Sequence, residues 1–296
     1  MKSFENYDRH AVIQYTQSLR QNLKGCQSSR NIECVHRSRT FGRRLFNTIW
    51  IFRKIFSGKD YSRWRKVLQR LHKNLNVVRD LDVKIHFLKD FNKNEHPIFL
   101  ENLAKKLSDD RECLQDELEE TIDYFLKTKT LEQIELFFSS ENHLLKSNQS
   151  HQLSDFAQKK ILRRLKQFLS HDRVVDQPEN IDELHQMRIA AKKLRYSLET
   201  FEPFYGTRLK KFTNTVWKFQ DLLGEVHDYD VWGKLLPKTI FLNKKQHLEG
   251  LEYFLKHCQG QRSKTYKNFL RTWHEEQRRK TWPKLKKLIN REKTKI

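Results

Sequence analysis

Apolar side chains recur every three or four residues along most of this chain, which is the spacing of one face of an α-helix. Two clear runs are Trp64, Leu68, Leu71 and Leu75, and later Met187, Leu194, Leu198 and Phe201. Glycine (8) and proline (5) are scarce in 296 residues, although the turns of sheet-rich folds need both. The chain is therefore predicted to be all-α, with helices of roughly 20 to 35 residues, longer than the average in globular proteins.

Clusters of turn-forming residues divide the chain into these helices. Breaks are predicted at Ser57–Asp60, Asn92–Pro97, Ser139–Gln152 and Ser170–Asn180, between Pro203 and Gly206, and between Gly233 and Pro237. After the last break, a single long basic helix is predicted from about Gln261 to Lys293.

The chain contains an internal repeat at half its length. Val35–Leu45 aligns with Leu184–Leu194, so that His36 pairs with His185, 149 residues later. Arg79–Val83 aligns with His227–Val231, 148 residues later. Two blocks in the same order at nearly one offset predict a duplication, with one helical half at residues 1–148 and the other at 149–296. Each half is long enough for a helical bundle.

The first repeated helix carries a basic row on the side opposite its apolar face. On a helical wheel Arg39, Arg43 and Lys54 fall within about 60° of His36. The second copy has the row His185, Arg188, Lys192 and Arg195. The helices that follow add further basic positions opposite their own cores: Lys66, Arg70 and Lys73 in the first half, and Lys211 and Lys218 in the second.

Such rows suit a linear polyanion. Steps of three or four residues rise by about 4.5 to 6 Å, so successive cations can follow closely spaced phosphates. Arginine donates two hydrogen bonds from a planar fork, and lysine supplies an adaptable point charge. A nearby phosphate chain raises the pKa of histidine, and we therefore expect binding to strengthen modestly as the pH falls towards 6.

A basic helix face opposite a core is often only a solvated surface. Here the row recurs in both copies, and no acidic residue interrupts it between Val35 and Lys54. Unpaired like charges at this spacing repel one another, which favours an anionic partner. The aspartates of the second block, such as Asp82 and Asp230, are interpreted as buried structural groups, paired with the Arg or His of their own motif or with the histidine row.

Composition points the same way. Lysine and arginine total 59 against 37 acidic residues, for a net charge of +22, which concentrates polyanions around the protein. The four cysteines form no Cys-x-x-Cys pair, so neither a zinc site nor a disulfide framework is indicated. Without a signal-peptide core or a run of about 18 apolar residues, a cytoplasmic protein without a membrane partner is expected.

These motifs resemble the CHAD family, the conserved histidine α-helical domain. The second half is the closer match: it has His185-x-x-Arg188-x-x-x-Lys192-Lys193-x-Arg195, followed by Gly224 and Asp228-x-Asp230. The first half has His36-x-x-Arg39-x-x-x-Arg43-Arg44, but Phe46, Trp50 and Asn76 depart from the pattern. These departures predict weaker ligand contacts in the first half.

The resemblance implies two pseudo-symmetric four-helix bundles with a basic cavity between them. It also implies non-catalytic binding of inorganic polyphosphate, possible association with polyphosphate granules, and no cofactor. The polyphosphate-binding residues it indicates, together with the wheel, are His36, Arg39, Arg43, Arg44, Lys66, Arg70, Lys73, His185, Arg188, Lys192, Lys193, Arg195, Lys211 and Lys218.

Two other functions remain open. A nucleic-acid-binding protein could use the same basic surface, although no helix-turn-helix, zinc-finger or RNA-recognition signature is evident. An enzyme is disfavoured, because the sequence shows no Gly-rich phosphate loop, no His-Glu-x-x-His motif and no nucleophile with an obvious base.

Overall fold

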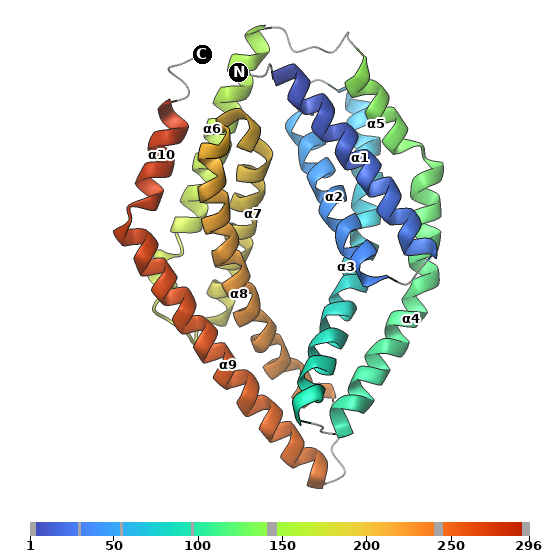
Figure 1. Cartoon of the computed structure of the whole chain (residues 1–296), viewed down its shortest axis with the longest axis vertical. Helices are drawn as coiled ribbons and strands as arrows, with labels where there is room; N and C mark the ends of the chain where they lie inside the picture. The colour runs from blue at the N-terminus through green and yellow to red at the C-terminus, as the bar shows by residue number, and fades with distance from the viewer. Residues whose placement is uncertain are drawn as a thin grey trace. The chain divides into compact units, whose positions relative to one another are not determined.

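The computed structural model describes residues 4–28, 31–53, 56–95, 98–140, 147–239 and 245–291, and every element in these ranges is a helix (Figure 1). The prediction of an all-α chain is confirmed. The helices are α1 (Phe4–Ser28), α2 (Ile32–Ile51), α3 (Gly58–Glu95), α4 (Ile98–Lys127), α5 (Thr130–Ser139), α6 (Ser147–Leu169), the 3-10 turn η2 (Asp172–Val174), α7 (Ile181–Tyr205), α8 (Thr207–Thr239), α9 (Lys245–Arg278) and α10 (Thr281–Arg291).

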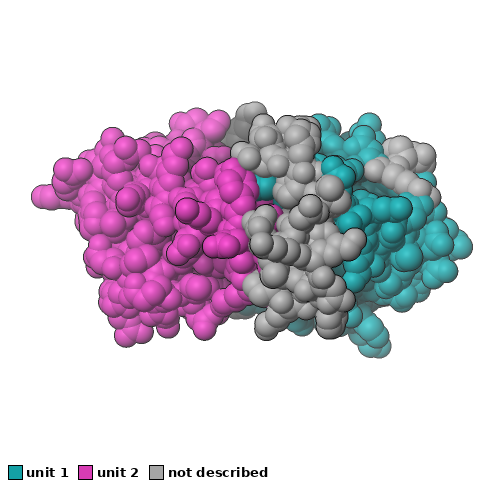
Figure 2. All heavy atoms as spheres, turned by 90° about the horizontal axis from the view of Figure 1, so that it is seen from below, with its two compact units in different colours: residues 1–145 teal, residues 146–296 magenta. Residues whose placement is uncertain are grey.

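The chain divides into two compact units, coloured separately in Figure 2. Unit 1 spans Met1–Leu145 and contains α1 to α5, and unit 2 spans Lys146–Ile296 and contains α6 to α10. The duplication, the symmetry and the cavity between the halves stay predictions, so each unit is described by itself.

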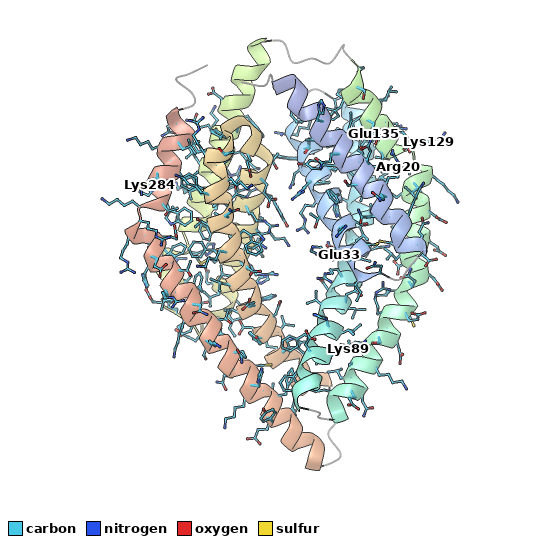
Figure 3. The ribbon with its side chains drawn as sticks, viewed as in Figure 1. Arg20, Glu33, Lys89, Lys129, Glu135 and Lys284 are labelled. Atoms are coloured by element: carbon cyan, nitrogen blue, oxygen red, sulfur yellow. The ribbon has the colours of Figure 1, made fainter. Side chains whose placement is uncertain are left out.

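The core of unit 1 lies where α1 packs on α2 and α3 packs on α4. Trp64, Leu68, Leu71 and Leu75 of α3 are at most 2% exposed, as their helical spacing predicts. Burying one such side chain contributes about 1.5–3 kcal/mol. At the α1–α5 contact, Arg20 bonds Glu135 at 3.1 Å, and both are labelled in Figure 3.

Unit 2 buries the second apolar run on α7 between α6 and α8. Met187, Leu194, Leu198 and Phe201 are at most 1% exposed, so this predicted face is also confirmed. An aromatic cluster completes the core and joins α6, α8, α9 and α10 through Phe168, Phe219, Trp273 and Trp282. Together these contacts hold α7 and α8 side by side (Figure 1).

Several predicted breaks are confirmed by local capping. Ser57 precedes α3, and its Oγ accepts a hydrogen bond from the Asp60 backbone N–H at 3.0 Å, which satisfies a helix-terminal donor. The Ser170–Asn180 stretch separates α6 from α7. Gly206 ends α7 with a φ of 65°, a conformation that glycine adopts without a steric penalty.

Two of the expected boundaries are wrong. Gly233 and Pro237 lie inside α8, which continues to Thr239. The buried Trp232 packs on Phe254 of α9 with 6.0 Å between ring centroids, and this tertiary contact outweighs the weak local propensity. Likewise, α6 already begins at Ser147, inside the predicted polar junction.

The single C-terminal helix predicted for Gln261–Lys293 is also wrong. Helix α9 ends at Arg278, α10 begins at Thr281, and Lys293 lies outside the described residues. The break is at Lys280, which has a φ of 55° and therefore cannot continue a right-handed helix. Lys129, labelled in Figure 3, makes the same break between α4 and α5 with a φ of 52°.

Candidate polyanion-binding faces

The first candidate face lies where α2 meets α3 in unit 1. Asn31 caps α2 by accepting a hydrogen bond from the Glu33 backbone N–H, so the basic row begins one turn into the helix. Arg39 Nε donates to Asn76 Oδ1 of α3 at 2.8 Å, and this half-buried bond fixes the direction of the guanidinium. Burial, followed by the charge of Arg79, which lies one turn beyond Asn76, lowers the pKa of the His36 imidazole. We call His36, Arg39, Asn76 and Arg79 the unit 1 face.

Close packing of α2 on α3 depends on Gly42. A Cβ at this position would lie 3.0 Å from Cε1 of His72, which is tighter than most real contacts, so any larger residue would require the ring to shift. Burial of His72 lowers the pKa of its imidazole to about 4, and the ring is therefore neutral at physiological pH. His72 is thus part of the helix interface beneath the unit 1 face and adds no positive charge to it.

The second candidate face lies where α7 meets α8 in unit 2. His185 Nδ1 is 3.1 Å from His227 Nδ1, and the ring centroids are 4.2 Å apart. At that distance the Nδ1–H of one ring donates a hydrogen bond to the unprotonated Nδ1 of the other. Arg188 reaches the same helix contact, with its Nε 3.7 Å from the position that a Cβ on Gly224 would take. We call His185, Arg188, Lys192 and His227 the unit 2 face.

The histidines of both faces are held towards their neutral forms. Burial, followed by the charge of Arg188, lowers the pKa of His227 to about 4. The same two causes lower the pKa of His185, and burial followed by Arg79 lowers that of His36. In the free protein the fixed positive charge of each face therefore comes from arginine and lysine.

The other arginines predicted to bind polyphosphate contact side chains outside the two faces. Arg195 lies 3.3 Å from Glu199 and stacks over Tyr196, so its charge is partly compensated. Arg44 lies over the rings of Tyr15 and Phe41, on the α1 side of α2.

On α3, Arg70 stacks on Tyr124 of α4 with 4.6 Å between its Cζ and the ring centroid, and it therefore leans away from α2. Arg43 is half-buried and lies close enough to lower the pKa of His72. Lys66, Lys73, Lys193, Lys211 and Lys218 are exposed, and Lys54 lies outside the described residues.

The buried aspartates have partners that differ from those predicted. Asp82 pairs with Arg111 of α4 at 3.0 Å, and Asp230 pairs with Arg262 of α9 at 2.5 Å. Their expected partners within the motifs, Arg79 and His227, instead turn towards α2 and α7. Arg79 and Asp82, like His227 and Asp230, are three residues apart and differ by only about 60° around their helix, so the divergence lies in the directions of the side chains and not in opposite sides of the helix.

Sequence reasoning therefore missed Asn76, Arg79 and His227 as members of a face. Their signal was present: Arg79 and His227 occupy the same position in the second repeated block. From the sequence, this block predicts a structural pairing with the neighbouring aspartates, because a helical wheel of one helix does not show which side meets the next helix.

Among the described residues there is neither a metal-binding cluster nor a membrane-spanning helix. No group of three or more His, Cys, Asp or Glu side chains in these ranges is placed to hold a metal ion. No helix there is long and apolar enough to cross a bilayer.

The described residues form helices, and the second helix of each unit carries a histidine followed three residues later by an arginine. These two features define a class of basic helical domains. The CHAD domain family model matches residues 10–237, and the chain belongs to this family. Helices α9 and α10 lie beyond the matched residues. Among solved structures, the crystal structure of the CHAD domain from the plant Ricinus communis is similar, with 18% identity over 90% of this chain and 91% of that chain and a TM-score of 0.61. That likeness shows the fold. No curated protein matches the chain.

Proposed function

We propose that this protein binds inorganic polyphosphate without catalysing a reaction, through the unit 1 and unit 2 faces. The observation that carries the proposal is the repeated placement of one arginine. Arg39 and Arg188 stand at the same position of the repeat, three residues after a histidine, and each is half-buried against the following helix. A guanidinium held in this way loses little side-chain entropy when it binds phosphate.

The chemistry of the faces selects for phosphate oxygens. Arginine and lysine donate charge-assisted hydrogen bonds, and a repeating phosphate chain can accept many of them at once. Two faces on one chain would raise the overall affinity for a long polymer, because the second contact becomes intramolecular. Such binding would also allow the protein to associate with polyphosphate granules.

Nucleic acid is the second candidate, and one observation favours it. Trp217 of α8 is 51% exposed, and an exposed aromatic ring beside cations can stack on an unpaired base. Polyphosphate remains the first proposal because the faces themselves consist of His, Arg, Lys and Asn. A base-dependent ligand would lose affinity in Trp217→Ala, whereas polyphosphate would not.

Calorimetric titration with long-chain polyphosphate, with double-stranded DNA and single-stranded RNA at equal phosphate concentration beside it, tests the proposal. Arg39→Ala and Arg188→Ala should each weaken polyphosphate binding about tenfold or more, the usual effect of removing a hydrogen bond to a charged group. Arg44→Ala and Arg70→Ala remove the same charge from other sides of α2 and α3, and should change affinity by less than about twofold.

Equal losses in all four variants would show that the charge of +22 acts only as a diffuse field. Equal affinity for polyphosphate and a nucleic acid would lead to the same conclusion, whereas tighter binding of a nucleic acid would favour the second candidate. Circular dichroism of each variant separates loss of binding from loss of fold, and an assay for released phosphate tests the absence of catalysis.

A further inference from the structure

We infer that the two faces hold phosphate by different means: the unit 2 face takes up a proton at the His185–His227 pair when the polyanion binds, whereas the unit 1 face uses the permanent charge of Arg79. This inference rests on the proposed function. It makes binding at the unit 2 face more sensitive to pH than binding at the unit 1 face.

The difference follows from one position of the repeat. His36 and His185 occupy the same place on α2 and α7. The position that faces them is Arg79 on α3 in unit 1 and His227 on α8 in unit 2. A guanidinium is charged at every physiological pH, whereas an imidazole changes charge near neutrality. Unit 1 therefore carries a fixed cation where unit 2 carries a titratable one.

The contact between the two rings limits the pair to one added proton. In the neutral pair one Nδ1–H donates to the other Nδ1 across 3.1 Å. A first added proton can be accommodated at Nε2 of the donating ring without breaking this bond, because the accepting ring already carries its own proton on Nε2. A second would place two N–H groups opposite each other, and would require the rings to separate.

The surroundings keep the pair neutral until an anion arrives. Arg188 and Lys192 on α7 and Lys234 on α8 are the cations that oppose protonation, and Asp182 is the acid that favours it at His185. Burial is the largest cause and, like these cations, lowers the pKa of both rings. A phosphate chain on Arg188 offsets these positive charges and adds negative charge beside the rings, which raises the pKa of the pair in the complex above its value in the free protein.

The sign of the pH dependence follows from this difference. A group whose pKa is higher in the complex strengthens binding below that pKa, and the gain is lost as the pH rises through it. For one proton the affinity changes by at most about tenfold per pH unit. In unit 1, His36 has Glu33, Arg37 and Arg39 beside it, and the corresponding partner position holds the permanent cation Arg79. In unit 2 that position gives His185 the Nδ1 of a second imidazole, which can accept a hydrogen bond from a protonated ring. His36 should therefore contribute much less proton uptake than the pair.

Proton uptake is measured by titrating the protein with long-chain polyphosphate at pH 7 in two buffers that differ in their enthalpy of ionisation. Long chains are used because only the terminal phosphates titrate near neutral pH, and in a long polymer they contribute little to the measured number of protons. The wild type should take up between about 0.5 and one proton per unit 2 face occupied. His227→Arg gives unit 2 the arrangement of unit 1, and should bind at pH 8 at least as tightly as the wild type while losing most of this uptake.

The reciprocal variant, Arg79→His, should add proton uptake and weaken binding at pH 8, because it makes the unit 1 face titratable. His86→Arg is the matched control: His86 is also on α3, is highly exposed and pairs with Asp90 outside the face. It should leave the number of protons unchanged.

The outcomes separate this inference from the proposed function. Tight binding with no dependence on the buffer, or with uptake that persists in His227→Arg and His227→Gln, overturns the proton-coupled pair and leaves polyphosphate binding intact. Absence of binding at every pH overturns both. Thermal melting of each variant shows whether the fold is retained.

Discussion

Asp230 on α8 and Arg262 on α9 form an almost buried ion pair, with 2.5 Å between a carboxylate oxygen and Nε, and side chains that are 6% and 17% exposed. The same guanidinium also donates to the Pro178 carbonyl at 2.7 Å. It therefore joins α8, α9 and the loop before α7. In unit 1, Asp82 and Arg111 make the corresponding pair between α3 and α4.

Removal of Arg262 should be strongly destabilising, because it leaves the carboxylate of Asp230 buried without a counter-ion. Arg262→Ala is expected to lower the free energy of unfolding by about 3–5 kcal/mol. Arg37→Ala breaks an exposed pair with Glu33, 60% and 56% exposed, and should cost less than about 1 kcal/mol. Urea denaturation followed by circular dichroism measures both, and similar losses would mean that burial of the pair does not matter.

Lys280 offers a stabilising substitution. Its φ of 55° places an L-residue in the left-handed region between α9 and α10, where glycine is not strained. Lys280→Gly should raise the free energy of unfolding by about 0.5–1 kcal/mol, since the relief of strain is partly offset by the more flexible unfolded chain. Lys256→Gly, an exposed position inside α9, should instead lower it by about 1 kcal/mol. If thermal denaturation shows both glycines to be destabilising, the junction is not strained.

The apolar spacing was enough to predict the helices and the buried sides of α3 and α7, because burial of a helix face depends on periodicity alone. It did not predict the end of α9, since Lys280 is not a residue that usually adopts a positive φ. Gly233 and Pro237 predicted a turn that does not form. The contact between Trp232 and Phe254 supports a continuous α8, and local sequence does not show it because the two residues are more than 20 positions apart.

The candidate faces were predicted in part for a related reason. His36, Arg39, His185 and Arg188 share a spacing that is visible within one helix. Their neighbours on α3 and α8 depend on the register between two helices, which local sequence does not specify. The repeat alone could have indicated that register, because corresponding positions in two copies tend to meet corresponding partners.

His72 should make the stability of the protein depend on pH. Burial lowers the pKa of its imidazole to about 4 in the folded protein, whereas the unfolded chain has the ordinary value of 6.5. Between these values the unfolded state binds more protons, so stability falls as the pH decreases, by at most about 1.4 kcal/mol per pH unit. His72→Gln, which introduces the residue found at the equivalent Gln220, should lose less stability between pH 7 and pH 5 than the wild type. His86→Gln, at a highly exposed position, should behave like the wild type.

The salt dependence of binding should distinguish contacts on the faces from general attraction. Each phosphate contact releases a counter-ion, so the logarithm of the affinity falls linearly with the logarithm of the salt concentration, with a slope near the number of contacts. The double variant Arg39→Ala/Arg188→Ala should reduce that slope by about two, because both guanidiniums contact the polymer. Arg44→Ala/Arg70→Ala removes the same total charge, but its guanidiniums lie over Tyr15, Phe41 and Tyr124 rather than on the faces. Its slope should stay close to that of the wild type, and equal reductions in the two double variants would argue that net charge, and not the faces, determines binding.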